Sequence, residues 1–106
     1  MSDDKTTFRI EISKRAAQML VSHAAFLAKV SPEKAEPLVA SFESAAKSLE
    51  KMPYRCPRIS YEYMSDRKYR SLLFEKRYLI IYQISDETVF IDYILDCRQD
   101  YDWLLN

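Results

Sequence analysis

The first thirty residues show two kinds of apolar spacing. From Thr7 to Ile12 every second side chain is apolar, with Arg9 and Glu11 between them, which predicts a short strand with one buried face. Ser13 follows, and serine is a preferred N-cap residue. Behind it, apolar residues recur at steps of three and four as far as Val30. This spacing predicts an amphipathic helix with one apolar stripe.

A second helix is expected after the Ser31-Pro32 pair, because Ser caps helices and Pro fits the first helical position. The same apolar spacing continues to Met52. Pro37 lies inside this pattern and should kink the first turns or delay the helix start, and Pro53 should end the helix. The gap between the two helices is so short that it predicts an antiparallel helical hairpin.

The second half of the chain reads as a linker followed by strands. We expect Pro53 to Arg67 to be a surface linker, and residues 99–105 fit a short C-terminal helix. Three runs rich in Ile, Leu, Tyr and Val are strand-like. They are Lys68–Phe74, Tyr78–Ile84 and Thr88–Leu95. Connections this short predict an antiparallel meander. The expected fold is α+β in the order β-α-α-β-β-β, with an N-terminal helical hairpin packed on an antiparallel sheet, in a single domain spanning residues 1–106.

Composition excludes several classes of function. Lys plus Arg and Asp plus Glu both count 16, so the formal net charge is zero, and a neutral chain binds nucleic acid poorly without a local basic patch. The chain has no glycine, where average usage predicts about seven. Gly-rich phosphate loops and dinucleotide fingerprints are therefore excluded, and the turns must use Asp, Glu, Ser and Lys.

No cofactor or metal site is expected. Cys56 and Cys97 lie far apart and outside any metal-binding motif, so we expect two reduced thiols. His23 is the only histidine, and its place at the edge of an apolar helix stripe favours a structural role. The longest apolar run, Tyr78 to Tyr82, is too short to span a bilayer, and the polar N-terminus does not resemble a signal peptide. The expected location is the cytoplasm.

Charge is uneven along the second half. From Arg55 to Arg77 there are seven basic residues against three acidic ones. One interpretation is a docking surface for an acidic partner or for RNA, with Tyr side chains available for stacking. The other is a solvated strand edge whose charges discourage pairing between molecules.

Arg70 stands out because it lies within an apolar strand, on the same face as Leu72 and Phe74. An arginine in that setting needs an acidic or carbonyl partner. In a structural role it would pair with a carboxylate such as Asp92 or Asp96. In a functional role it would present its planar fork to phosphate or carboxylate at the sheet surface.

Short motifs in a fixed order accompany this layout. They are Ala16-Ala17, Ser31-Pro32-Glu33-Lys34-Ala35, Leu49-Glu50-Lys51-Met52-Pro53, Tyr69-Arg70, Tyr82-Gln83-Ile84 and Ile94-Leu95-Asp96-Cys97-Arg98-Gln99-Asp100. Together they resemble the RelE/ParE superfamily of bacterial type II toxins, over nearly the whole chain. The resemblance implies a toxin neutralised by a cognate antitoxin, a segment of which wraps over the toxin's helices and sheet.

The superfamily has two branches, which cut mRNA on the ribosome or inhibit DNA gyrase. Nuclease members tend to carry basic groups or His at positions that here hold Leu72, Leu79 and Asp96. Arg70 and Arg98 match family positions in both branches and do not discriminate between them. The three departures favour the gyrase-inhibiting, ParE-like branch.

The leading hypothesis is therefore a toxin that inhibits DNA gyrase by protein binding, with no assigned catalytic residue. The target-binding residues are expected to be Arg70, Arg77, Arg98, Trp103 and Leu104. Trp103 and Leu104 could equally fold back onto the core. One alternative is a ribosome-dependent mRNA endonuclease that uses Arg70, Arg98 and Tyr82, and another is a degenerate toxin that retains only antitoxin binding. No membrane partner is expected, and DNA would be reached only through the antitoxin.

Overall fold

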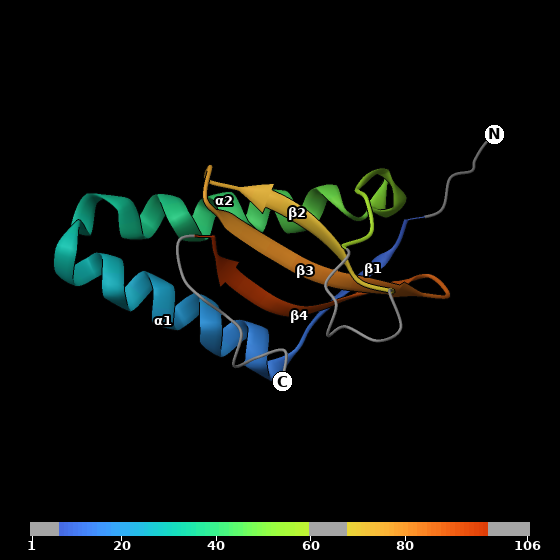
Figure 1. The fold of residues 1–106 in the computed structure, drawn as a ribbon, viewed down its shortest axis with the longest axis horizontal. Helices are drawn as coiled ribbons and strands as arrows, with labels where there is room; N and C mark the ends of the chain where they lie inside the picture. The colour runs from blue at the N-terminus through green and yellow to red at the C-terminus, as the bar shows by residue number, and fades with distance from the viewer. Residues whose placement is uncertain (1–6, 60–67, 98–106) are drawn as a thin grey trace.

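The computed structural model describes residues 7–59 and 68–97, which form a four-stranded sheet packed against a pair of helices (Figure 1). In chain order the elements are β1 (Arg9–Ile12), α1 (Lys14–Val30), the 3₁₀ turn η1 (Pro32–Lys34), α2 (Ala35–Ser48), the 3₁₀ turn η2 (Pro53–Arg55), β2 (Arg70–Phe74), β3 (Tyr78–Ser85) and β4 (Thr88–Asp96). The expected α+β class and element order are confirmed. The expected terminal helix at 99–105 lies outside the described residues.

The sheet has the strand order β1-β4-β3-β2. β2, β3 and β4 form the expected antiparallel meander. β1 instead pairs with β4 in parallel, with Ile10 opposite Val89 and Ile12 opposite Ile91. The sheet is therefore mixed, because the chain passes through the whole helical hairpin and two strands before it returns beside β1.

The start of α1 is fixed from two sides. Ser13 Oγ accepts a hydrogen bond from the Ala16 backbone N–H at 3.0 Å, which confirms the expected N-cap. The Ser13 backbone N–H also donates to Ile91 O at 2.9 Å. This second bond ties the helix start to the middle of β4, against which α1 packs.

The second helix differs from its expected bounds at both ends. Ser31 makes no side-chain cap bond, and the single turn η1 precedes α2, which begins only at Ala35. This agrees with the delayed start expected from Pro37. The helix ends at Ser48, five residues before Pro53, and Pro53 begins η2 instead.

The core lies between the helices and one face of the sheet. Its buried members are Ala16, Leu27, Leu38, Phe42, Ala46, Leu49, Cys56, Phe74, Tyr78, Ile80, Tyr82, Val89, Ile91 and Ile94. Tyr78 and Tyr82 therefore share a face, as their spacing predicts. Leu73, on the opposite face of β2, is 54% exposed. Neither described helix is long and apolar enough to cross a membrane.

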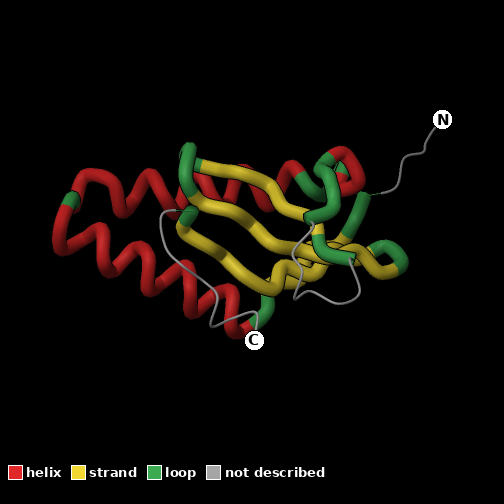
Figure 2. The backbone as a smooth tube through the Cα atoms, in the orientation of Figure 1, coloured by secondary structure: helices red, strands yellow, loops and turns green. Residues whose placement is uncertain are grey.

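The turns are built without glycine, as the composition requires. Glu75, Lys76 and Asp86 have φ angles of 50°, 68° and 56°, in the left-handed region that costs other residues about 1 kcal/mol or more. Ser41 Oγ donates to Glu75 Oε1 at 2.6 Å, which fastens the β2–β3 turn to α2. Figure 2 shows this turn at the end of the sheet nearer the connection between the helices, which extends beyond it.

Candidate functional site

Arg70 is held by backbone carbonyls rather than by a carboxylate. Its Nη1 donates to Cys56 O and, at 3.4 Å, to Tyr54 O, and its guanidinium lies 5.2 Å from the centre of the Tyr54 ring. The alternative in which Arg70 pairs with a carboxylate such as Asp92 is wrong. Asp92 instead accepts bonds from Tyr69 and Gln83 at 2.9 and 2.8 Å. The reason is geometric, because Arg70 lies on the helix-facing side, next to the carbonyls of η2.

Tyr82 lies directly opposite Arg70 in the β2–β3 pair. It is completely buried, and its hydroxyl donates to Pro53 O at 2.7 Å. Burial raises the pKa of Tyr82 well above its usual range, and the nearby Cys56 thiol adds to the effect. Tyr82 therefore stays neutral and presents no surface to a large substrate.

We call Pro53, Tyr54, Cys56, Arg70 and Tyr82 the arginine corner. Pro53 and Cys56 are buried, so the start of the expected surface linker is packed against the sheet. Tyr54, Arg55, Pro57 and Arg58 are exposed, as a surface linker predicts, so the expectation is corrected only at Pro53 and Cys56. Residues 60–67 lie outside the described residues. Arg70 Nη1 and the Tyr82 hydroxyl donate to backbone oxygens of residues 53–56, so the corner attaches η2 to the sheet.

A second arrangement lies at the other end of the β2–β3 hairpin. It is a hollow of about 370 Å³, which we call the basic hollow, lined by Leu27, Lys34, Leu38, Glu75, Lys76, Arg77 and Tyr78. Lys34 comes from the turn between the helices, and Lys76 and Arg77 come from the β2–β3 turn. The Arg77 guanidinium lies 5.6 Å from the centre of the Tyr78 ring, and Arg77 O accepts the Cys97 N–H at 2.8 Å.

Another hollow, of about 470 Å³, runs along the helical hairpin. We call it the hairpin groove, and its lining is Leu20, Val21, Ala24, Ala25, Ala28, Ala35, Glu36 and Val39. Val21 is 66% exposed. The small alanine side chains leave the space between α1 and α2 open, and the lining is apolar except for Glu36.

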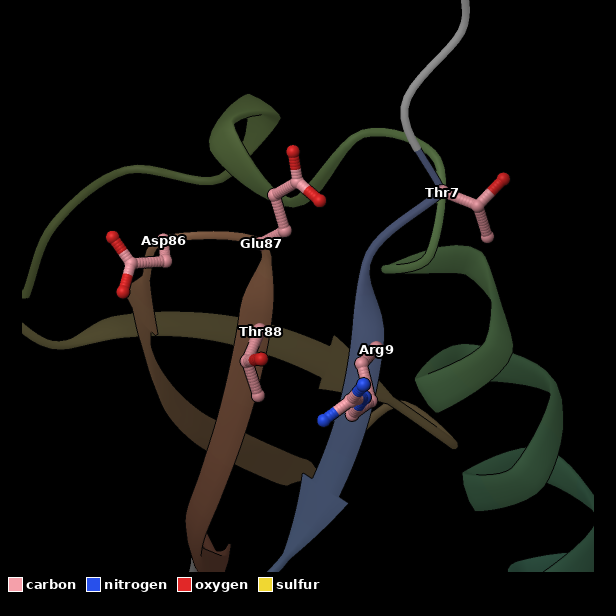
Figure 3. Close-up of a pocket in the computed structure, with 5 residues that line it drawn as sticks. All are labelled: Thr7, Arg9, Asp86, Glu87 and Thr88. Carbon is pink, nitrogen blue, oxygen red and sulfur yellow. The ribbon is translucent and has the colours of Figure 1, made fainter.

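A polar hollow of about 590 Å³ at the start of β1 does not form a convergent site. It is lined by Thr7, Arg9, Asp86, Glu87 and Thr88. Figure 3 shows the side chains of Thr7, Asp86 and Glu87 pointing away from one another. Thr7, Asp86 and Glu87 therefore do not converge on one ligand.

The remaining candidates for chemistry have structural settings. His23 Nε2 lies 2.8 Å from Ile94 O, and its ring lies 5.3 Å from that of Tyr78, which fits the structural role expected for it. Both cysteines are free, as expected. Desolvation, and then the charge of Asp96, raise the pKa of the Cys97 thiol, which lowers its reactivity. Residues 7–59 and 68–97 contain no cluster of three or more His, Cys, Asp or Glu that could hold a metal.

The structure does not bring the two described target-binding candidates together. Arg70 begins β2 and Arg77 lies beyond its other end, whereas Arg98, Trp103 and Leu104 lie outside the described residues. Sequence reasoning missed Lys34 and Lys76 as partners of Arg77. The available signal was that these residues lie in two turns, one between the helices and one between two strands. When a helical hairpin packs on a strand hairpin, the two turns can lie close together.

Comparison with known proteins agrees with this fold. The family model described as ParE toxin of type II toxin-antitoxin system, parDE, matches residues 10–101. The solved structure "Chromosomal ParDE TA system from P. aeruginosa" is similar with a TM-score of 0.71 and 18% identity, over 85% of this chain and 96% of that chain.

A second solved structure, of the toxin-antitoxin complex RelBE2 from Mycobacterium tuberculosis, has a TM-score of 0.60 and 22% identity, over 90% of this chain and 97% of that chain. At these identities the two structures show a shared fold. A comparison with curated protein sequences finds no significant match. Because the family model spans most of the sequence, the chain belongs to the ParE toxin family of type II toxin–antitoxin systems.

Proposed function

We propose that this toxin acts by binding and inhibiting DNA gyrase, and that a cognate antitoxin neutralises it. The observation that carries the choice of target is the arginine corner. Arg70 and Tyr82 are the described members of the alternative nuclease set, and Arg70 Nη1 and the Tyr82 hydroxyl donate to backbone oxygens. Tyr82 is also fully buried. Groups engaged in this way are poorly placed to stabilise charge or move protons on an RNA substrate.

The positions of the family departures support the same choice. Leu72 is half-buried against the core, Leu79 is half-buried, and Asp96 is 3% exposed. None of the three offers a positive charge to RNA phosphate, and the chain as a whole is neutral. Target contact would then fall to Arg77 among the described candidates, together with Arg98, Trp103 and Leu104. Gyrase acts in the cytoplasm, so the proposal places the toxin there.

Purified gyrase tests the target directly. Supercoiling of relaxed plasmid is measured with and without the purified toxin, and the expected result is inhibition at micromolar toxin. The same preparation is added to a translating ribosome extract, where mRNA should stay intact. Intact supercoiling together with mRNA cleavage would replace gyrase by the ribosome as the target. If neither reaction changes and expression leaves growth unaffected, the chain is a degenerate toxin.

The hairpin groove supports a site for the antitoxin. Its lining is apolar and Val21 is 66% exposed, and exposed apolar patches of this kind mark sites of protein contact. The two similar solved structures are of toxin–antitoxin systems by their titles. An apolar helix or extended segment of the antitoxin would fill the groove.

A matched pair of variants tests this site with the product of the neighbouring reading frame as antitoxin. Ala25→Asp places a charge in the groove, whereas Ala40→Asp makes the same change at an exposed α2 position outside its lining. The expected result is an affinity at least about tenfold weaker for Ala25→Asp alone, because a carboxylate must be desolvated. Equal affinities for both variants would place the antitoxin elsewhere and leave the gyrase proposal intact.

A further inference from the structure

The basic hollow has an excess of positive charge in a chain whose net charge is zero. Its lining includes Lys34, Lys76 and Arg77, and its acidic member is Glu75. Glu75 is already tied to α2 by the 2.6 Å hydrogen bond from Ser41. The hollow therefore presents cations to a ligand, and a complementary ligand is anionic.

The bottom of the hollow is apolar. Leu27, Leu38 and Tyr78 are 3%, 0% and 2% exposed, so the charged groups stand above a dry, low-dielectric layer that strengthens charge–charge attraction. The aliphatic stems of lysine and arginine can also cover an apolar side chain of a ligand. The lining thus suits a ligand that carries a carboxylate next to an apolar group.

The same features disfavour nucleic acid. Binding of single strands uses exposed aromatic faces on which bases stack, but the Tyr78 ring is buried and Arg77 lies over it at 5.6 Å. Glu75 would repel a run of phosphates. An acidic polypeptide needs no exposed stacking surface, and because its carboxylates are spaced by other side chains, Glu75 repels it less than it repels a run of phosphates.

The hollow is also fixed in shape. Glu75 and Lys76 hold left-handed φ angles without glycine, and such strained residues persist where the surrounding structure holds them and cluster at binding sites. The bond from the Cys97 N–H to Arg77 O anchors the turn to the end of β4. A site fixed in advance loses less entropy when it binds.

We infer that the basic hollow is a docking site for an acidic segment of a protein partner. A carboxylate of Asp or Glu would bind Arg77 and the two lysines, and a neighbouring apolar side chain would lie on their stems. The inference deepens the proposed function, since Arg77 belongs to the proposed target-binding surface. The ligand class can nevertheless be tested without gyrase.

The test uses the isotope-labelled full chain and the peptide acetyl-Asp-Leu-Glu-Leu-Asp-amide, followed by amide chemical shifts. The expected result is saturable shifts at Lys34, Lys76 and Arg77. The amide counterpart, acetyl-Asn-Leu-Gln-Leu-Asn-amide, should cause none. A short oligothymidylate should bind more weakly than the acidic peptide.

Matched variants test whether the lysines of the hollow supply the charge that binds the peptide. Lys34→Gln/Lys76→Gln should weaken peptide binding about fivefold. Lys47→Gln/Lys51→Gln, which removes the same charge from exposed sites outside the hollow, should change it less than about twofold. Glu75→Gln keeps an acceptor for Ser41 and should tighten binding, because it removes the opposing charge.

Several results would overturn the inference. They are equal binding of the neutral peptide, equal loss in both lysine pairs, preference for oligothymidylate, and shifts outside the hollow. Concentration-dependent shifts at the same amides without peptide would assign the hollow to a second copy of the chain instead. Gyrase inhibition without peptide binding rejects this inference alone, and peptide binding without gyrase inhibition rejects the gyrase proposal alone.

Discussion

The two ends of the β2–β3 hairpin each carry an arginine, but the two side chains have different surroundings. At the arginine corner, Arg70 donates to Cys56 O and Tyr54 O and covers the Tyr54 ring. At the basic hollow, Arg77 covers the Tyr78 ring beside two exposed lysines and lines an open space. Both arginines are half-buried, but one guanidinium donates to carbonyls of its own chain, whereas the other lines a volume that a partner can enter.

The difference shows that residue type and family position do not identify which arginine is available to bind a partner. Arg70 matches a family position, yet its donors serve the neighbouring turn η2. Arg77 lies in a turn with no distinctive motif, yet two separate chain reversals supply cations beside it. What decides the role is whether backbone acceptors lie within reach of the guanidinium. The following changes test this comparison, in order of decreasing expected effect on stability.

Arg70→Ala should lower the free energy of unfolding by about 2–3 kcal/mol, because it leaves carbonyls at η2 without their charged donor. Arg70→Lys should lose less, since it keeps the charge but not the planar fork. Urea denaturation followed by tyrosine fluorescence measures both. An effect of Arg70→Ala no larger than that of Arg77→Ala would contradict the structural role of the corner.

Tyr82→Phe should cost about 1–2 kcal/mol, because the buried Pro53 O loses its donor. The pKa of Tyr82 is raised in the folded state, so its contribution is complete below the usual tyrosine pKa of about 10. Above that pH the unfolded chain ionises first, and the contribution is lost as pH rises toward the folded pKa. Stability measured at alkaline pH should therefore fall less steeply in Tyr82→Phe than in the natural sequence.

Lys76→Gly should stabilise the fold by about 0.5 kcal/mol. Glycine removes the energetic cost of the left-handed backbone conformation, and this gain is partly offset by the larger conformational entropy of glycine in the unfolded chain. Lys47→Gly, in the last turn of α2, is the control and should destabilise by about 0.5–1 kcal/mol. Thermal unfolding of the two variants checks the sign. If Lys76→Gly destabilises the fold, the lysine side chain contributes more to stability than the left-handed backbone conformation costs.

Arg77→Ala should change stability by less than about 0.5 kcal/mol, because its ring contact is partly exposed and solvent screens the charge. Gyrase inhibition should nevertheless fall, so the largest functional loss would accompany the smallest change in stability. Dose–response curves for supercoiling, made alongside the unfolding measurement, give both values. Full inhibition by Arg77→Ala would exclude this residue from the target contact.

The local elements were the most predictable part of the fold. The alternation before Ser13 and the three- and four-residue steps behind it are set by backbone geometry, and the expected cap and helix are present. The end of α2 was less predictable. Leu49 continues the apolar spacing and is fully buried, yet the helix stops before it, because packing of an apolar side chain does not require helical backbone.

The candidate site depended far more on tertiary contacts. Asp92 has the carboxylate that a partner of Arg70 would need, but it accepts bonds from Tyr69 and Gln83 instead. Its position depends on strand alternation and on the register shift between Ile81 and Tyr82. The parallel pairing of β1 with β4 is likewise a long-range choice. Neither the partners of Asp92 nor the parallel pairing of β1 can be predicted from residues that are close in the sequence.

By itself, the sequence determined the element order, the glycine-free turns and the resemblance to the toxin superfamily. These depend on spacing and residue type, which act over a few positions along the chain. The tertiary structure alone decided that Arg70 holds η2 and that Lys34, Lys76 and Arg77 surround one hollow. Whether an arginine is satisfied or available depends on which carbonyls and charges the fold brings within a few ångströms of it. The sequence supplies those groups, and only the packing of the helical hairpin on the sheet sets the distances between them.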